Sequence, residues 1–317
     1  MKQVTPAVSP LTGRRRIMQK IWRQRWLYLM LLPAFACLIL FSYAPLSGWY
    51  IAFSEYKIGK PLFGGEWVGL KHFQEIFQTN ASLGALLENT LAMNVGSLLL
   101  NISVPMVLAI LLCELRWKTG AKIVQTVAFF PHFISWVIVY SLFCALFAQN
   151  NGVINRFLVE HGVLEKGINL LGDPKYSWGL MIGLSLWKSC GYNMIIYLSS
   201  ISGISTELYD AAALDGANRL QQIRYITIPN LLPTASVLLI MNAGWILGSN
   251  LETYMVFQTP TNLAKMDVLD MYIYKYGLDL MDFPYATAMT IVKTAVGVLI
   301  MLFVNWLAKK LNQNTII

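Results

Sequence analysis

The sequence predicts an all-α membrane protein with six transmembrane helices. Of its 317 residues, 56% are hydrophobic and 13% are charged, whereas an ordinary soluble domain has roughly 25% charged residues. Six mostly apolar segments are long enough to cross a bilayer, which takes about 20 helical residues. Short polar loops separate them and no linker divides the chain, so we expect a single membrane domain.

The predicted spans lie near 27–53, 86–113, 123–148, 178–202, 231–257 and 284–308. The first is too long and too far from the terminus for a cleaved signal peptide, and no small-residue cleavage site follows it, so we expect it to remain as an anchor. It contains Pro33 and Pro45, which membrane helices tolerate as kinks. The six-helix domain thus covers 27–310 and leaves a tail at 311–317.

Lysine and arginine predict the orientation, because these cations are retained on the cytoplasmic side. With the amino terminus inside, more than half of the 24 Lys and Arg residues fall in inner segments, although the outer loops near 54–85, 149–177 and 258–283 are longer. An even number of spans then places both termini in the cytoplasm. The tail at 311–317 would accordingly be cytoplasmic.

A basic segment at 1–26 precedes the first span. The part through Gly13 is rich in Pro, Ser and Thr and is predicted to be disordered. Arg14 to Trp26 mixes cations with Ile and Trp, which is typical of a helix lying on the inner leaflet. Either this segment contacts a partner or anionic lipid, or its charges only orient the chain.

Composition and spacing exclude several other classes of function. The net charge of +8 comes from cations placed next to apolar runs, not from a basic stripe with interleaved aromatic residues, so nucleic-acid binding is not expected. The four cysteines form no CxxC pair, and His72, His132 and His161 are scattered, so we expect no metal site. No GxSxG elbow or paired His or Asp lies within the spans, and a catalytic role is not expected.

The most informative stretch is the loop at 203–229, which lies on the cytoplasmic side between the fourth and fifth spans. Ser205 or Thr206 can cap a helix whose first turn carries Glu207 and Asp210, the charges that suit the positive end of a helix dipole. Such a short helix is suited to docking against a partner.

The rest of this short helix presents a narrow surface, and Gly216 ends or bends the helix. The residues on this surface recur at spacings of three and four, and the two alanines allow close approach: Leu208, Ala211, Ala212 and Asp215. An amphipathic interfacial helix without a partner is the alternative interpretation.

This loop resembles the cytoplasmic signature of permeases from binding-protein-dependent ATP-binding-cassette (ABC) importers: EAA, three residues, G, nine residues, then I-x-L-P. The matching positions are Asp210, Ala211, Ala212, Gly216, Ile226, Ile228 and Pro229. Asp210 stands where Glu is usual and Ile228 where Leu is usual. The spacing out to Pro229 and the cytoplasmic placement favour this interpretation over an unpartnered interfacial helix.

The resemblance implies a coupling helix that sits in a groove of an ATPase subunit. Closure of that subunit on ATP would rock the membrane helices between inward-open and outward-open states. The residues expected to couple are Glu207, Asp210, Ala211, Ala212, Leu214, Asp215 and Gly216.

A wider resemblance spans nearly the whole chain, which looks like the first-type permease of carbohydrate importers, in the subgroup for oligosaccharides or polysaccharide fragments. The blocks that carry it are Tyr43 to Tyr56, Trp67 to Phe73, Phe130 to Trp136, Trp187 to Tyr197 and Asp267 to Gly277. It implies the type I ABC importer permease fold in a bacterial inner membrane. The implied partners are a second related permease, two ATPase subunits and an extracytoplasmic substrate-binding protein.

The chain contains no GxxxxGK[ST] phosphate-binding loop, so it is not expected to bind ATP itself. We expect it to hold no cofactor, with ATP and Mg bound by the partner ATPase subunits. An ATP-independent secondary sugar transporter is the alternative, but it would not need a docking loop at 203–229.

Polar residues at membrane depth are costly and mark candidate pathway residues. Sugars are bound by aromatic faces and by amide or charged groups on their hydroxyls. The candidates for a substrate pathway are Trp187, Lys188, Asn193, Asn242, Trp245, Asn250, Glu252 and Lys293.

Lys188 and Lys293 support two hypotheses. They could form a cationic passage for acidic, uronate-containing oligosaccharides, because a desolvated ammonium group favours a carboxylate. Alternatively, each could pair with a buried acid or carbonyl and hold the helices together. Acidic residues of the outer loops, such as Asp267 and Asp270, could contact the binding protein or simply be solvated.

Overall fold

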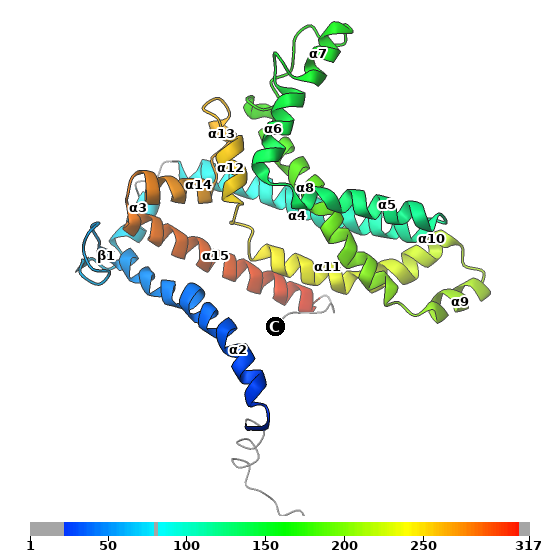
Figure 1. The fold of residues 1–317 in the computed structure, drawn as a ribbon, viewed down its shortest axis with the longest axis horizontal. Coiled ribbons are helices and arrows are strands. Elements are labelled where there is room, and N and C mark those ends of the chain that lie inside the picture. Colours follow the sequence, from blue (N-terminus) through cyan, green and yellow to red (C-terminus); the bar gives the residue numbers. More distant parts are fainter. Residues whose placement is uncertain (1–21, 79–81, 311–317) are drawn as a thin grey trace, which may run out of the picture.

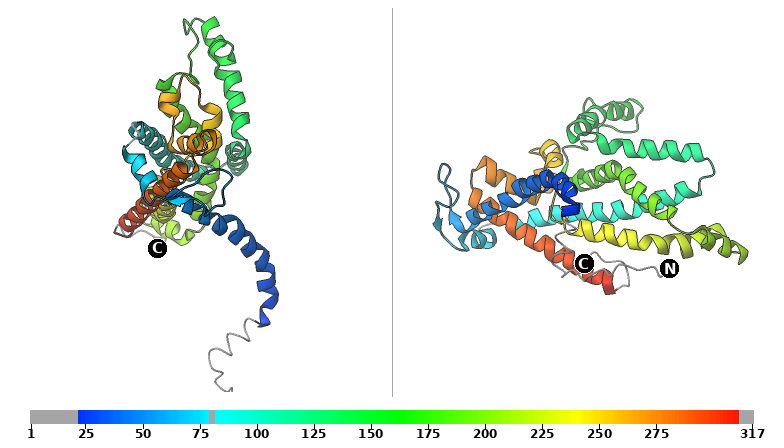
Figure 2. Two further views of the ribbon diagram at one scale, coloured as in Figure 1. Left: turned by 90° about the vertical axis from the view of Figure 1, so that its left-hand side faces the viewer. Right: turned by 60° about the horizontal axis from the view of Figure 1, so that its bottom comes forward.

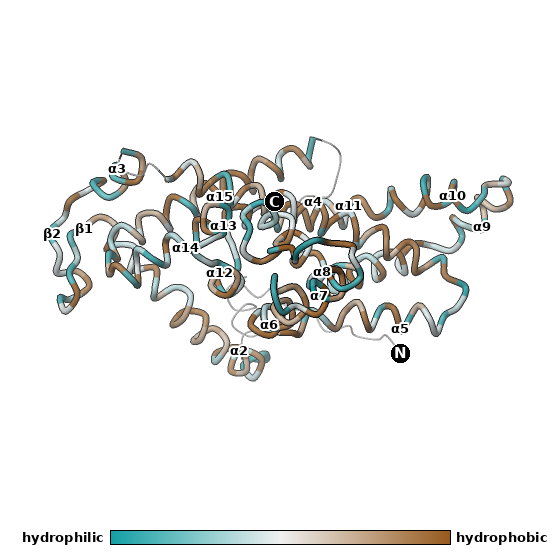
Figure 3. The backbone as a smooth tube through the Cα atoms, turned by 90° about the horizontal axis from the view of Figure 1, so that it is seen from above, coloured by the Kyte–Doolittle hydropathy of each residue, from teal (hydrophilic) through white to brown (hydrophobic). Residues whose placement is uncertain are grey.

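The computed structural model describes residues 22–78 and 82–310, which form a predominantly helical molecule (Figure 1). The long helices lie beside one another in an elongated bundle, with α9 at one end and the β1 ribbon at the other (Figures 1 and 2). A trace coloured by hydropathy is mainly apolar along the long helices, and its hydrophilic residues concentrate in the connections (Figure 3). Most of the basic segment at 1–26 and all of the tail at 311–317 lie outside the described residues.

The first predicted span is confirmed as one helical stretch of 29 residues, Arg25–Phe53. It comprises α2 (Arg25–Leu38), a π-helical turn (Ile39–Tyr43) and a 3₁₀ segment (Ala44–Phe53). The irregular turn lies just before Pro45, which lacks an N–H group and crowds the carbonyl four residues earlier. None of the residues of α2 is buried, and the helix diverges from the bundle (Figure 2).

A small ribbon follows the first helix. β1 (Ser54–Glu55) pairs antiparallel with β2 (Glu66–Trp67), and α3 (Lys71–Gln78) comes next. Lys71 Nζ lies 2.6 Å from Glu55 Oε1. This hydrogen bond and the ammonium charge lower the pKa of Glu55, and the same contacts raise the pKa of Lys71.

The centre of the bundle is the pair α4 (Leu83–Glu114) and α8 (Pro174–Ser202). The two helices pack so closely that a Cβ added at Gly96 would lie 2.6 Å from Ile182 Cδ1. Toward the α9 end, Ala109, Met194 and Leu231 belong to one buried apolar cluster. The second and fourth predicted spans are thus confirmed as helices.

The prediction of one continuous span at 123–148 is wrong. The segment begins earlier, as α5 (Lys118–Phe129), passes through a 3₁₀ turn (Phe130–Phe133) and continues as α6 (Trp136–Phe147), bent by 104° from the preceding part. Pro131 supplies no backbone donor, and Ser135 Oγ accepts a hydrogen bond from the Ile138 N–H as a new helix cap.

Beyond α6 a short helix, α7 (Val153–Glu160), projects from the bundle (Figure 1). Asn155 fixes it, because its amide Nδ2 donates to the carbonyls of Phe147, Ala148 and Ile168. Its Oδ1 accepts from the Ile168 N–H. One buried side chain, Asn155, therefore holds α7 against the end of α6.

The fifth predicted span, near 231–257, is wrong at both ends. A helix of 25 residues, Arg219–Ala243, begins inside the predicted loop and comprises α10 (Arg219–Gln222), a π-helical turn (Ile223–Thr227) and α11 (Ile228–Ala243). Helical structure resumes only at α12 (Leu251–Phe257), which Asn250 caps. Glycines at 244 and 248 make the intervening backbone poor at continuing a helix.

The chain closes with α13 (Leu263–Met266), α14 (Leu269–Tyr274), a π-helical turn (Lys275–Asp279) and α15 (Phe283–Lys310), which confirms the sixth predicted span. In the described residues four helices are long and apolar enough to cross a membrane, and the bent pair would make a fifth. α8 is 29 residues long but carries Lys188 and several Ser residues and is not among those four. Six membrane crossings remain a prediction.

Candidate functional site

The loop at 203–229 contains the expected short helix, α9 (Thr206–Leu214), at the end of the molecule opposite β1 (Figure 1). Ser205 is its N-cap, with the Glu207 N–H 3.3 Å from Ser205 Oγ. The acidic side chain of Glu207 lies in the first turn, where its negative charge interacts favourably with the positive end of the helix dipole.

Gly216 ends this helix. It has a φ of 80°, a left-handed conformation that costs side-chain-bearing residues roughly 1–2 kcal/mol. The Ala217 N–H reaches back 2.9 Å to the Ala212 carbonyl, which closes the helix end. Asn218 then caps α10 in a capping box with Gln221.

The surface of α9 is exposed in this chain. None of its residues is buried, and Leu214 is 90% exposed. Tyr209 anchors α9 to the π-helical turn before α11, because its Oη lies 2.9 Å from Thr227 Oγ1. An exposed apolar side chain on a fixed, capped helix is what a protein partner can use.

A cavity of about 200 Å³ lies between α4, α8 and α11, and we call it the amide cavity. Trp245 forms part of its wall. Its polar lining consists of side-chain amides and hydroxyls: Asn94, Asn101, Asn193, Asn242, Ser97 and Ser185. Ser189 Oγ donates to Asn101 Oδ1 over 2.7 Å, and Asn193 Nδ2 donates to the Asn101 carbonyl over 3.2 Å.

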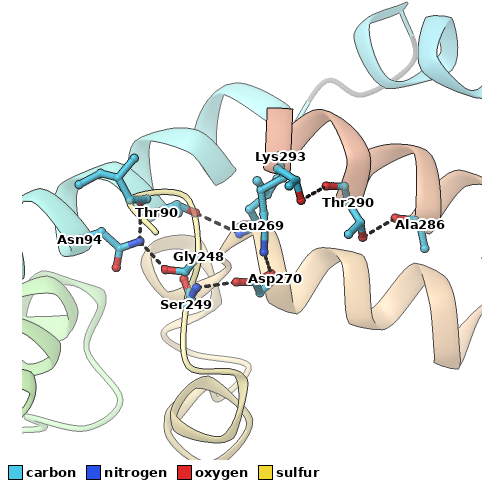
Figure 4. Close-up of polar contacts among 11 residues, drawn as sticks. Thr90, Asn94, Gly248, Ser249, Leu269, Asp270, Ala286, Thr290 and Lys293 are labelled. Atoms are coloured by element: carbon cyan, nitrogen blue, oxygen red, sulfur yellow. Dashed lines mark hydrogen bonds and ion pairs between the residues drawn. The ribbon is translucent and has the colours of Figure 1, made fainter. Parts of the chain in front are cut away.

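Residues 244–250, here called the break segment, separate α11 from α12 and form a wall of this cavity. Asn94 Nδ2 donates to the carbonyls of Ile246 and Gly248 over 2.8 and 2.9 Å (Figure 4). The Ser249 N–H donates to the carboxylate of Asp270 (Figure 4). These partners satisfy backbone groups that a membrane cannot hydrate, as required where a helix is interrupted beside a cavity.

Two more cavities share the break segment. A side pocket of about 110 Å³ adjoins the amide cavity, because Asn94, Ser185 and Gly248 line both. An open cavity of about 500 Å³ is lined by Ser249 and by Trp245, which also lines the amide cavity. The break segment is therefore common to all three cavities.

Lys293 and Asp270 form an ion pair on the wall of the open cavity (Figure 4). Their side chains are 17% and 18% exposed. Because Asp270 also accepts from the break segment, this pair ties α14 and α15 to it. Asp270 is thus turned into the molecule, not out toward solvent.

The structure brings some predicted pathway residues together and leaves others apart. Asn193, Asn242 and Trp245 meet in the amide cavity, while Asn250 lines the side pocket and Lys293 lines the open cavity. Trp187, Lys188 and Glu252 line none of these three cavities.

Lys188 instead reaches the bend between α5 and α6. Its Nζ donates to the carbonyls of Pro131, His132 and Ile134, at 3.3 Å for Pro131 and 3.2 Å for His132. It also lies 5.2 Å from the ring centre of Trp136. Lys188 thus pairs with carbonyls and Lys293 with an acid, as in the second of the two hypotheses for these lysines.

Sequence reasoning missed Asn94, Asn101 and the inward role of Asp270. The first two lie seven residues apart, about two helical turns, inside an apolar run, and that polar pair was a usable signal. For Asp270 no signal was available, because its pairing with Lys293 depends on how α14 packs against α15.

A helical bundle with interrupted helices beside polar cavities, and an exposed, capped helix at one end, is typical of a membrane transport subunit. The chain belongs to the family described as "Binding-protein-dependent transport system inner membrane component", which matches residues 106–313. Its fold is therefore the expected permease fold of type I ABC importers, and an ATP-independent secondary transporter is not favoured.

Two curated relatives come from Bacillus subtilis (strain 168). The chain is 39% identical to the polygalacturonan/rhamnogalacturonan transport system permease protein YteP, over 96% of this chain and 94% of YteP. It is 33% identical to Protein LplB, over 93% of this chain and 92% of that protein.

Solved structures of a bacterial ABC transporter for alginate share the fold. One, described as involved in the import of the acidic polysaccharide alginate, has a TM-score of 0.83 and 34% identity, covering 93% of this chain and 99% of that chain. A second, in complex with an alginate pentasaccharide-bound periplasmic protein, has a TM-score of 0.84 and 33% identity, covering 95% and 100%.

Proposed function

We propose that this chain forms half of the translocation pathway of an ABC importer for acidic, uronate-containing oligosaccharides. The observation that carries the proposal is the capped, exposed helix α9 with the importer signature, in a bundle whose interior holds amide-lined and aromatic-lined cavities. The substrate class is supported by relatives named for polygalacturonan and rhamnogalacturonan and by a structural neighbour that imports alginate.

The working complex would contain a second related permease, two ATPase subunits that bind ATP and Mg, and an extracytoplasmic substrate-binding protein. The alginate structure with a periplasmic protein supports the last of these. In this arrangement α9 and both termini face the cytoplasm of a bacterial cell. The chain itself hydrolyses no ATP, and α9 transmits closure of the ATPase to the bundle.

Sugar would pass along the break segment, which adjoins all three cavities. Asn193 and Asn242 offer amides to hydroxyl groups, and Trp245 offers a ring face to the C–H surface of a sugar. Lys293 is neutralised by Asp270, whereas Lys188 forms no ion pair with any carboxylate of residues 22–78 and 82–310. Lys188 lines none of the three cavities, but it lies 5.2 Å from the ring centre of Trp136, which lines the side pocket, so this uncompensated cation would favour an acidic substrate from beside the path.

The test is ATPase activity of the reconstituted complex with its co-purifying subunits and sugar-loaded binding protein. A panel of neutral and acidic oligosaccharides is compared for wild type and Gly216→Pro. Proline fixes φ near −65° and cannot adopt the 80° found at Gly216. The matched control is Gly203→Ala at the end of α8, where φ is −85° and an added Cβ makes only an ordinary contact.

We expect stimulation by acidic oligosaccharides, abolished in Gly216→Pro and retained in Gly203→Ala. If no ATPase subunit co-purifies, or if sugar flux needs no ATP and ignores the Gly216 change, the proposal fails. Stimulation by neutral sugars alone would retain the importer and reject the acidic substrate.

A further inference from the structure

The open cavity contains two charged side chains of opposite sign, Asp270 and Lys293. In the described part of the chain, they are the only charged residues that line it. The rest of its lining is apolar or aromatic with a few hydroxyl groups, so nothing else there can balance a charge. Because the two groups form an ion pair, the cavity is neutral as a whole although it contains a lysine.

Asp270 is fixed through both of its carboxylate oxygens. Oδ1 accepts from Lys293 Nζ, and Oδ2 accepts from the Ser249 N–H of the break segment (Figure 4). Asp270 lies on α14 and Lys293 on α15, so this one carboxylate joins two helices and a loop. Its side chain is only 18% exposed. The counter-charge of Lys293 is therefore built into the fold.

The ion pair sets the electric field inside the open cavity. An unbalanced charge need not touch a sugar to act on its carboxylate, because a Coulomb interaction extends over several ångströms where little water screens it. Two opposite charges in contact largely cancel at such distances. The carboxylate of Asp270 thus decides whether an occupant meets a neutral wall or a cationic one.

Lys188 provides a contrast within the same bundle. Its ammonium is held by the carbonyls of Pro131, His132 and Ile134, which are dipoles and leave its net charge in place. Lys293 has a full counter-charge instead. The two lysines therefore differ in the charge that they present, and Asp270 makes the difference.

We propose that Asp270 is a specificity residue, which cancels the charge of Lys293 in the open cavity and so limits the preference of the path for acidic sugars. This inference rests on the proposed function, in which sugar passes along the break segment. A transport path needs sites that a substrate can leave as well as enter. One screened and one unscreened lysine meet that need.

The test compares four proteins that differ in the charge of this pair: wild type, Asp270→Asn, Lys293→Met and the double variant. The pair is neutral, positive, negative and neutral in that order. Asparagine keeps an oxygen that can accept from the Ser249 N–H. Each reconstituted complex, with binding protein in excess, takes up an equimolar mixture of an oligogalacturonide and its partly methyl-esterified form. The ratio of the two uptakes is measured, because losses of folded protein or of coupling cancel in it.

We expect the ratio of acidic to esterified sugar to rise about tenfold in Asp270→Asn and to fall about tenfold in Lys293→Met, for one unbalanced charge beside the path. The double variant should return close to wild type. Asp270→Glu keeps the charge and is the matched control, with a ratio near that of wild type. Both single variants should also lower the unfolding temperature, because each leaves a poorly hydrated charge unpaired.

A purely structural pair would lower the unfolding temperature and leave the ratio unchanged. If wild type takes up both sugars and all four proteins share one ratio, the specificity role of Asp270 is overturned alone. The same conclusion follows if both single variants shift the ratio in one direction. Should Asp270→Asn yield no complex, Lys293→Met and the double variant still provide the comparison. If wild type takes up neither sugar, the acidic substrate of the proposed function fails together with this inference.

Discussion

Asparagine side chains hold the non-helical backbone of this protein in place. Asn94 donates to two carbonyls of the break segment, and Asn155 to three around α7. Asn262 donates to the carbonyls of Leu171 and Phe257 over 2.8 and 2.9 Å. An amide can supply donors that an interrupted helix loses, which is why these residues occur where helices end inside the molecule.

Lys188 combines a structural contact with an uncompensated charge, and these two roles predict different mutant phenotypes. If the charge attracts the substrate, Lys188→Met should reduce transport of acidic oligosaccharides more than neutral ones, by a factor of about ten for each 1.4 kcal/mol of lost attraction. Uptake of both sugar classes into proteoliposomes measures this. Lys188→Arg, which keeps the charge, is the control.

Equal losses for both sugar classes in Lys188→Met would instead assign Lys188 to the bend alone. Its ammonium holds three carbonyls around Pro131 and Ile134, so its removal would then disturb the junction of α5 and α6 whatever the substrate.

At the scale of elements, the helices are interrupted where close backbone contacts and cavities occur. α11 ends at Ala243, where Gly244 meets Gly297 of α15. A Cβ added at Gly297 would lie only 2.7 Å from the Gly244 carbonyl oxygen. This crossing places the start of the break segment against α15, so its geometry depends on the absence of a side chain at 297.

Gly297→Val should therefore destabilise the protein by about 1–3 kcal/mol through overpacking at the crossing. Thermal unfolding of the purified complex measures the loss. Gly183→Ala in α8 is the matched control, because nothing lies within 4 Å of its added Cβ. That change should leave the protein as stable or slightly more stable, since alanine is the better helix former. If both variants unfold like wild type, the crossing is not close-packed.

At the scale of the whole molecule, α9 and the cavities are joined through α8 and the helix Arg219–Ala243. α9 connects these two helices at one end, and the break segment follows the second at its other end. Tyr197 and Leu231 lie in one buried cluster between them. Movement of α9 can thus be carried to the cavities by two packed helices.

The orientation of the molecule gives a further prediction. With both termini cytoplasmic, Glu165→Cys, after α7, should react with an impermeant thiol reagent added to intact cells, in a background without the native cysteines. Thr119→Cys, at the start of α5, should react only after permeabilisation. Both side chains are exposed, so a difference in burial would not explain a difference in their reactivity. The reverse pattern would invert the predicted topology and place α9 outside the cytoplasm.

The helical membrane class, the approximate location of each apolar segment and a short capped helix in the loop at 203–229 could be predicted from the sequence alone, whereas the structure chose Ser205 over Thr206 as the cap. These features depend on local composition and on turn and cap chemistry, which act over a few residues. The importer family was also recognisable from spacing within a single loop.

The positions where the apolar segments break, and the polar residues that meet there, depend on tertiary packing. The bend at Pro131 and the end of α11 at Ala243 depend on partners such as Lys188 and Asn94 from other helices. The ion pair of Asp270 with Lys293 likewise depends on packing between distant segments. A hydrophobic run marks a helix by its length, but a cavity is defined by what its neighbours leave unfilled.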